Sequence, residues 1–140
     1  MKTKWDLLLS MHKSKLRLQL ATLKSIRESI QTTINSHESV VSRQDYYKQQ
    51  LVEANWAHVE DWELTKRFLS DLEVIRLRCS EQRNALEFQE TAILKAVFSI
   101  QGDIRKFEWL REQKLKNHRM QEARQESELL EEWTISSARD

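Results

Sequence analysis

The stretch that decides the fold is residues 72–107, LEVIRLRCSEQRNALEFQETAILKAVFSIQGDIRKF. Apolar side chains recur in it at every seventh position, namely Leu72, Cys79, Leu86, Ile93, Ile100 and Phe107. An unbroken repeat of seven predicts a helix whose apolar stripe packs against a second helix in a coiled coil. The positions expected to complete this stripe are Phe68, Ile75, Ala96 and Leu110, with Val97 and Ile104 beside them.

A second run of sevens in the first part of the chain supplies the partner helix. Its members are Leu9, Leu16, Leu23, Ile30, His37, Gln44 and Leu51. The companion positions are Ile26, Val40, Tyr47 and Ala54, and Leu20, Ile34 and Val41 widen the stripe. Two such runs in one chain predict an all-α fold, a long antiparallel two-helix coiled-coil hairpin with its turn near residues 55–62.

The composition agrees with this fold class and excludes others. The 140 residues include no proline and only one glycine, Gly102, so the turns of a β or α/β domain are hard to build. Charged residues make up 32% and hydrophobic residues 39%, which suits helices with one buried stripe better than a compact layered core. With Cys79 as the sole cysteine, no internal disulfide can form, and we expect a cytoplasmic protein without a membrane-spanning segment.

The domain organisation follows from where the periodicity breaks. We expect a single hairpin with a first arm over residues 3–56, a turn over 57–61, a second arm over 62–118 and a polar tail over 119–140. Asn55 is the expected helix terminator and Asp61 the new N-cap. A rival break at residues 35–39 stays open, because short polar side chains lower helix propensity there. The tail is expected to fray when no partner holds it.

A turn near residue 60 also predicts a register, in which the numbers of facing residues add up to about 120. This register places Val41 opposite Cys79. It places His37 opposite Gln82 as a polar layer in the core, and Arg17 opposite Asp103.

No pattern in the sequence predicts catalysis or a cofactor. The histidines His12, His37, His58 and His118 are scattered, and none forms the two-histidine helical motif of a zinc site. A phosphate-binding loop needs more glycine than this chain has, and a two-helix fold offers no deep pocket. We therefore expect no enzyme activity, no metal and no cofactor.

Charge and tryptophan suggest where partners bind. The basic residues Lys13, Lys15 and Arg17 lie near the start, and acidic residues crowd the last twenty positions. A nucleic-acid partner is not expected, because no stacking platform accompanies the basic residues. Trp56 and Trp62 flank the expected turn, and they either cap the end of the core or anchor a partner.

The stretches FEWLREQ at residues 107–113 and QEARQESE at 121–128 resemble the aromatic and polar tail of one family. The whole chain is similar in architecture to the stalk subunits of type III secretion, the flagellar FliJ and injectisome YscO group. The resemblance implies a non-enzymatic stalk whose open end enters a hexameric secretion ATPase and promotes its assembly and activity. It also implies contacts with an export gate protein and with chaperones, and a cytoplasmic location that is peripheral to the inner membrane where the apparatus is assembled.

On this hypothesis, five basic residues face the ATPase: Lys13, Lys15, Arg17, Arg119 and Arg124. Trp56 and Trp62 then face a second partner. The alternative is a generic cytosolic coiled-coil adaptor or scaffold, which could be a homodimer. A helical nucleic-acid-binding protein is a more distant third.

Overall fold

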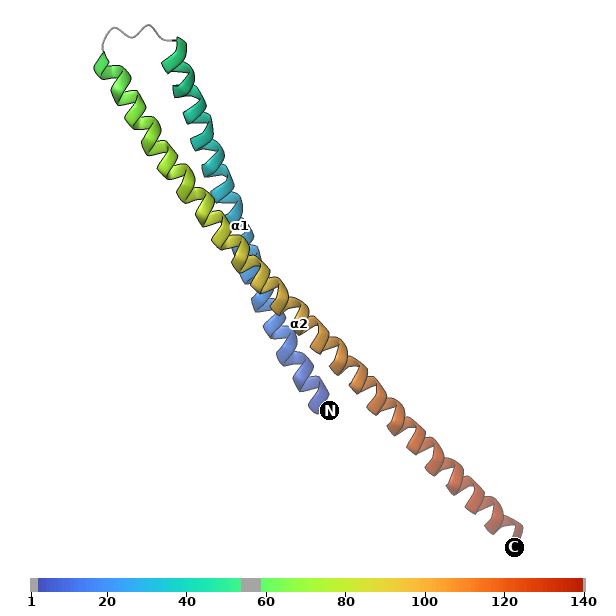
Figure 1. Cartoon of the computed structure of the whole chain (residues 1–140). Helices are drawn as coiled ribbons and strands as arrows, with labels where there is room; N and C mark the ends of the chain where they lie inside the picture. Colours follow the sequence, from blue (N-terminus) through green and yellow to red (C-terminus); the bar gives the residue numbers. More distant parts are fainter. Residues whose placement is uncertain (1–2, 54–58, 140) are drawn as a thin grey trace. The chain divides into compact units, whose positions relative to one another are not determined.

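A computed structural model describes residues 3–53 and 59–139, and it contains two long helices (Figure 1). Helix α1 is Lys4–Glu53, with 50 residues, and helix α2 is Val59–Arg139, with 81 residues. The helices run side by side in opposite directions, and this confirms the predicted helical hairpin. Both helices can be this long because proline is absent and the only glycine, Gly102, lies within α2 with no positive φ.

The start of α1 is fixed by a capping box. The backbone N–H of Thr3 donates to the carboxylate of Asp6 at 3.0 Å, and the Asp6 N–H donates to Thr3 Oγ1 at 3.3 Å. In α2, Glu60 and Asp61 lie in the first turn, where the helix dipole favours negative charge. The start of α1 is therefore determined by local sequence, whereas Asp61, the expected N-cap of the second helix, lies inside the first turn of α2.

The chain divides into two compact units, each containing a part of both helices. The terminal unit comprises residues 1–18 and 97–140, and the central unit comprises residues 19–96. In the terminal unit the buried apolar residues are Leu9, Val97 and Ile104. In the central unit they are Leu23, Val40 and Leu72, accompanied by two buried polar residues, Thr33 and Gln44.

The first run of sevens lies at the helix interface as predicted. Leu9, Leu23 and Gln44 are buried, and the other members are half-buried. Of the companion positions predicted for α2, Ala96 and Leu110 are half-buried and the neighbouring Val97 and Ile104 are buried, whereas Phe68 and Ile75 are exposed. In that part of α2 the half-buried positions lie one residue later, at Leu69 and Arg76. The charged residues Arg76, Glu90 and Arg111 are half-buried, so the edge of the interface is more polar than the sequence pattern suggested.

The register also differs from the predicted one. The predicted register places Tyr47 opposite Glu73, whereas in the structure Gln44 bonds to Glu73. The predicted partner of Asp103 is Arg17, but His12 occupies that place, with Nε2 3.9 Å from Asp103 Oδ2. Because α1 ends at Glu53 and α2 begins at Val59, the chain reverses earlier than residue 60.

The predicted polar layer is wrong for the same reason. His37 is half-buried, but Gln82 is exposed and does not face it in the core. The buried polar residues are Gln44, which bonds across to α2, and Thr33, whose hydroxyl donates to the Ser29 carbonyl at 2.9 Å. Both polar groups thus have hydrogen-bond partners, as buried groups require.

Several boundaries differ from the expected ones. Helix α1 runs without interruption through residues 35–39, so the rival break is not present. Residues 59–61, expected in the turn, belong to the first turn of α2. The expected terminator Asn55 and the stripe residue Ala54 lie outside the described residues. The expected polar tail is a continuation of α2 as far as Arg139, and its side chains are exposed from Leu115 to Ala138.

Candidate partner-binding surfaces

A cluster of three polar side chains joins the helices in the central unit. Gln44 Nε2 donates to Glu73 Oε2 at 2.8 Å, and Arg76 Nε donates to the same oxygen at 2.9 Å. A second nitrogen of Arg76 bonds to Glu73 Oε1, which makes that pair bidentate. These donors, Arg76 first and Gln44 second, lower the pKa of the Glu73 carboxyl from 4.5 to about 2. Each of the three side chains therefore bonds within the cluster, which links the two helices.

The terminal unit has its own ionic contact between the helices. Arg111 Nη1 donates to Asp6 Oδ1 at 3.1 Å, while the other oxygen of Asp6 accepts from Thr3. The hydrogen bond from the Thr3 backbone and that from Arg111 lower the pKa of Asp6 below its ordinary value. One carboxylate therefore caps α1 and also ties its first turn to α2.

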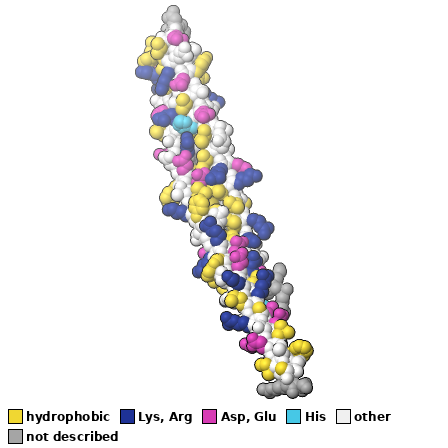
Figure 2. All heavy atoms as spheres, turned by 90° about the vertical axis from the view of Figure 1, so that its right-hand side faces the viewer, with side chains coloured by type: hydrophobic (Ala, Val, Ile, Leu, Met, Phe, Trp, Pro, Cys, Tyr) yellow, Lys and Arg dark blue, Asp and Glu magenta, His cyan; other side chains and the backbone are white. Residues whose placement is uncertain are grey.

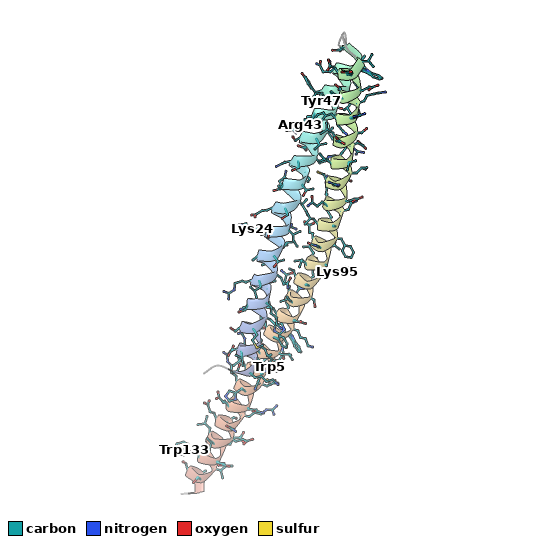
Figure 3. All side chains as sticks on the ribbon, turned by 90° about the vertical axis from the view of Figure 1, so that its left-hand side faces the viewer. Trp5, Lys24, Arg43, Tyr47, Lys95 and Trp133 are labelled. Carbon is teal, nitrogen blue, oxygen red and sulfur yellow. The ribbon has the colours of Figure 1, made fainter. Side chains whose placement is uncertain are left out.

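Aromatic rings pack beside this contact. The ring centroids of Trp5 and Phe107 are 6.0 Å apart, and those of His12 and Phe107 are 4.9 Å apart. The His12 ring also has Nδ1 2.8 Å from the Leu8 carbonyl oxygen. Figure 3 shows Trp5 where α1 begins alongside α2, and Trp133 far along α2. Trp5 thus packs against Phe107 of α2 near the start of α1.

A hollow opens where α1 begins on α2. It has a volume of about 500 Å³ and is lined by Thr3, Trp5, Asp6, Arg111, Glu112, Lys114, Leu115 and His118. Three of its ionisable groups are paired, since Arg111 bonds to Asp6 and His118 Nε2 lies 3.0 Å from Glu122 Oε1. Paired groups on an open surface suit contact with a partner protein better than proton transfer, for which a site must exclude water.

The five basic residues expected at the ATPase all lie in the terminal unit and are exposed, but they do not form one patch. At about 100° per residue, Lys13 and Arg17 share one side of α1, while Lys15 points to the other side. Arg119 and Arg124 are likewise on different sides of α2. The predicted set is therefore distributed around the unit.

Of the two tryptophans expected near the turn, the structure describes only Trp62. Trp56 lies outside the described residues. Trp62 is half-buried, and Lys66 Nζ lies 4.0 Å from its ring centroid in a cation–π contact. Because Lys66 is one helical turn further along α2, this contact is local, and the partner-binding role of Trp62 stays a prediction.

Sequence reasoning missed the exposed apolar side chains on the outer helix faces. Large examples are Leu7, Met11 and Leu18 on α1, and Phe88 and Phe98 on α2. Figure 2 shows hydrophobic side chains interspersed with charges of both signs on one face. The signal was present: Leu7, Met11, Ser14 and Leu18 have the spacing of a coiled-coil stripe, but on the opposite side from the run of sevens.

Comparison of the chain with protein-family models, with curated proteins and with solved structures finds no match in any of the three. Across residues 3–53 and 59–139, neither helix combines the length and the apolar character needed to cross a membrane. Within those same ranges, no three or more His, Cys, Asp or Glu side chains gather in a way that could hold a metal ion.

Proposed function

We propose that this chain is a non-enzymatic central stalk of a type III secretion system. On this proposal its terminal unit enters a hexameric ATPase, promoting ring assembly and ATP hydrolysis. The other end of the hairpin, with Trp62, contacts an export gate protein or a chaperone. Such a stalk would lie in the cytoplasm and reach the inner membrane only through the secretion apparatus.

The observation that carries the proposal is the continuation of α2 past the start of α1. Asp6 bonds to Arg111, and α2 then continues as a single helix to Arg139 with every described side chain exposed from Leu115 onward. An exposed helix of this length, with basic and acidic side chains around it, can contact several subunits of a ring at once. Complementary charge would orient the helix in the pore more than it would add affinity.

The test is ATP hydrolysis by a type III secretion ATPase from the same organism, measured with and without the purified chain. Stimulation is expected, and combined reversal of Lys13, Lys15 and Arg17 to Glu should abolish it. Reversal of Arg119 and Arg124 should also weaken it, because these residues lie on the single-helix part of α2. A chain carrying Arg78→Glu and Lys95→Glu is the control, since both residues are exposed in the central unit.

Stimulation that survives reversal of all five basic residues would contradict the proposed role. The proposed role would also lose its support if the control variant lost stimulation as completely as the test variants. In that case the loss would reflect overall charge and would not locate the contact in the terminal unit.

The second candidate is a coiled-coil adaptor without a secretion role. It is favoured by exposed aromatic side chains on α2, with Phe88 78% and Phe98 64% exposed, because large exposed apolar side chains mark interaction surfaces. An adaptor would bind a helical partner through these rings and leave ATP hydrolysis by the ATPase unchanged.

A further inference from the structure

We propose that the terminal unit self-associates, with the outer face of α1 in one copy packing against the end of α2 in a second copy. The inference rests on two exposed apolar stripes of matched length and opposite charge. It does not depend on the stalk function, because it concerns the chain alone.

The first stripe, here the basic stripe, consists of Leu7, Met11 and Leu18. These side chains are between 49% and 70% exposed, although they have coiled-coil spacing. At about 100° per residue they lie within about 40° of one another around α1 and span about 16 Å. Lys4 and Lys15 flank them on one side, and both are exposed.

The second stripe, here the acidic stripe, consists of Met120, Ala123, Leu130 and Trp133 near the end of α2. Its three large members are between 50% and 69% exposed. The four residues lie within about 140° of one another around α2 and span about 20 Å. The surrounding charges from residue 120 to 138 are Glu122, Glu126, Glu128, Glu131 and Glu132 against Arg124 alone.

The acidic stripe cannot reach the basic stripe of its own chain. Arg111 bonds to Asp6 near the start of α1, and α2 continues from there as unbroken helix to Arg139. Residues 120–133 therefore extend past the beginning of α1. A contact between the two stripes requires a second copy.

Both stripes present exposed apolar side chains, and the charges beside the two stripes are opposite in sign. Packing Met120, Leu130 and Trp133 against Leu7, Met11 and Leu18 removes large apolar groups from water on both sides. Around α2, Glu126 lies within the acidic stripe and Glu131 lies next to Met120, so this acidic end of α2 attracts Lys4 and Lys15. A two-fold dimer makes this contact twice, because the end of α2 in each copy packs on α1 of the other copy. The two small contacts then act together.

The experiment is sedimentation of the full chain over roughly a hundredfold range of concentration, at low and high salt. The expected result is a shift from monomer to dimer that high salt weakens. Variant K4E/K15E reverses the basic flank, and variant E126K/E131K reverses the acidic one. Each variant alone should dimerise at least tenfold more weakly, because like charges then face each other.

Mixing the two variants should restore the dimer, since each reversed flank then meets a flank of opposite charge in the other variant. L7E/M11E should also prevent dimerisation, whereas F88E, a substitution of an exposed ring in the central unit, should not. Circular dichroism checks that all variants keep their helix content, because every substituted side chain lies outside the buried core.

Three outcomes would overturn the proposal. The wild-type chain could stay monomeric at every concentration, which would leave both stripes to other proteins. The charge variants could dimerise as tightly as the wild type, or the mixture could fail to recover the dimer. Either of these two results would place the contact elsewhere.

Discussion

The amide of Gln44 donates a 2.8 Å hydrogen bond to the carboxylate of Glu73, and this bond joins α1 to α2 in the central unit. Gln44 occupies a position in the run of sevens where an apolar residue is usual, and it is only 5% exposed. A polar residue at such a position sets the register of a coiled coil at some cost in stability. The pairing of Gln44 with Glu73 therefore selects one alignment of two stripes that could otherwise slide.

The first prediction concerns the titration of Glu73. Its pKa of about 2 lies below the ordinary 4.5, so the carboxylate stabilises the folded state above pH 4.5, and this stabilisation is lost as pH falls toward 2. Arg76→Ala should raise the Glu73 pKa most, and Gln44→Ala should raise it less, in the order of their contributions. Side-chain carboxyl NMR measures the pKa of Glu73 in both variants. An unchanged pKa in Arg76→Ala would show that Arg76 does not bond to Glu73 as the structure describes. Arg83→Ala, which removes the partner of Glu87, is the control.

The second prediction is that Gln44→Leu stabilises the hairpin. Leucine matches the apolar members of the run, and Glu73 keeps its bidentate bond to Arg76, so no buried charge is left alone. We expect a gain of about 1 kcal/mol in the free energy of unfolding, measured by denaturant titration. Gln49→Leu, at an exposed position of α1, should change it little. A loss of stability in Gln44→Leu would mean that the hydrogen bond outweighs the burial of the leucine side chain.

The third prediction concerns the apolar core. Leu72 is 3% exposed and Leu64 is 60% exposed on the same helix. Leu72→Ala should cost about 2–3 kcal/mol, because it removes buried methyl groups and leaves a gap. Leu64→Ala should cost about 0.5 kcal/mol or less. Equal losses in thermal melts of the two variants would show that Leu72 does not lie in the helix interface.

The fourth prediction concerns the start of α1. Asp6→Asn removes the charge that accepts hydrogen bonds from Thr3 and Arg111, so the first turn of α1 should open more often. Amide hydrogen exchange of residues 4–9 should accelerate, while exchange around Leu72 should not change. Because the pKa of Asp6 is lowered, protection in the wild type should persist above its ordinary value of 3.8 and be lost as pH falls further. If residues 4–9 exchange as slowly in Asp6→Asn as in the wild type, the Asp6 carboxylate does not stabilise the start of α1.

The candidate surfaces were only partly predictable from the sequence. The basic residues Lys13 and Lys15 could be named from charge alone, because a long helix leaves such side chains exposed on any register. Their distribution on different sides of α1 follows from the helix itself. The basic stripe of Leu7, Met11 and Leu18 was overlooked, because a search for one buried stripe passes over a second one on the opposite face.

By itself, the sequence determined that this protein forms two long helices paired as a hairpin. Two runs of sevens and the lack of proline suffice for that, since helix formation and burial of a stripe are local properties repeated along the chain. Only the tertiary structure decided which residues face each other. Apolar stripes match in several registers with similar burial, and the selection falls to directional contacts such as Gln44 with Glu73 and Asp6 with Arg111. These contacts join positions far apart in the chain, and periodicity carries no information about them.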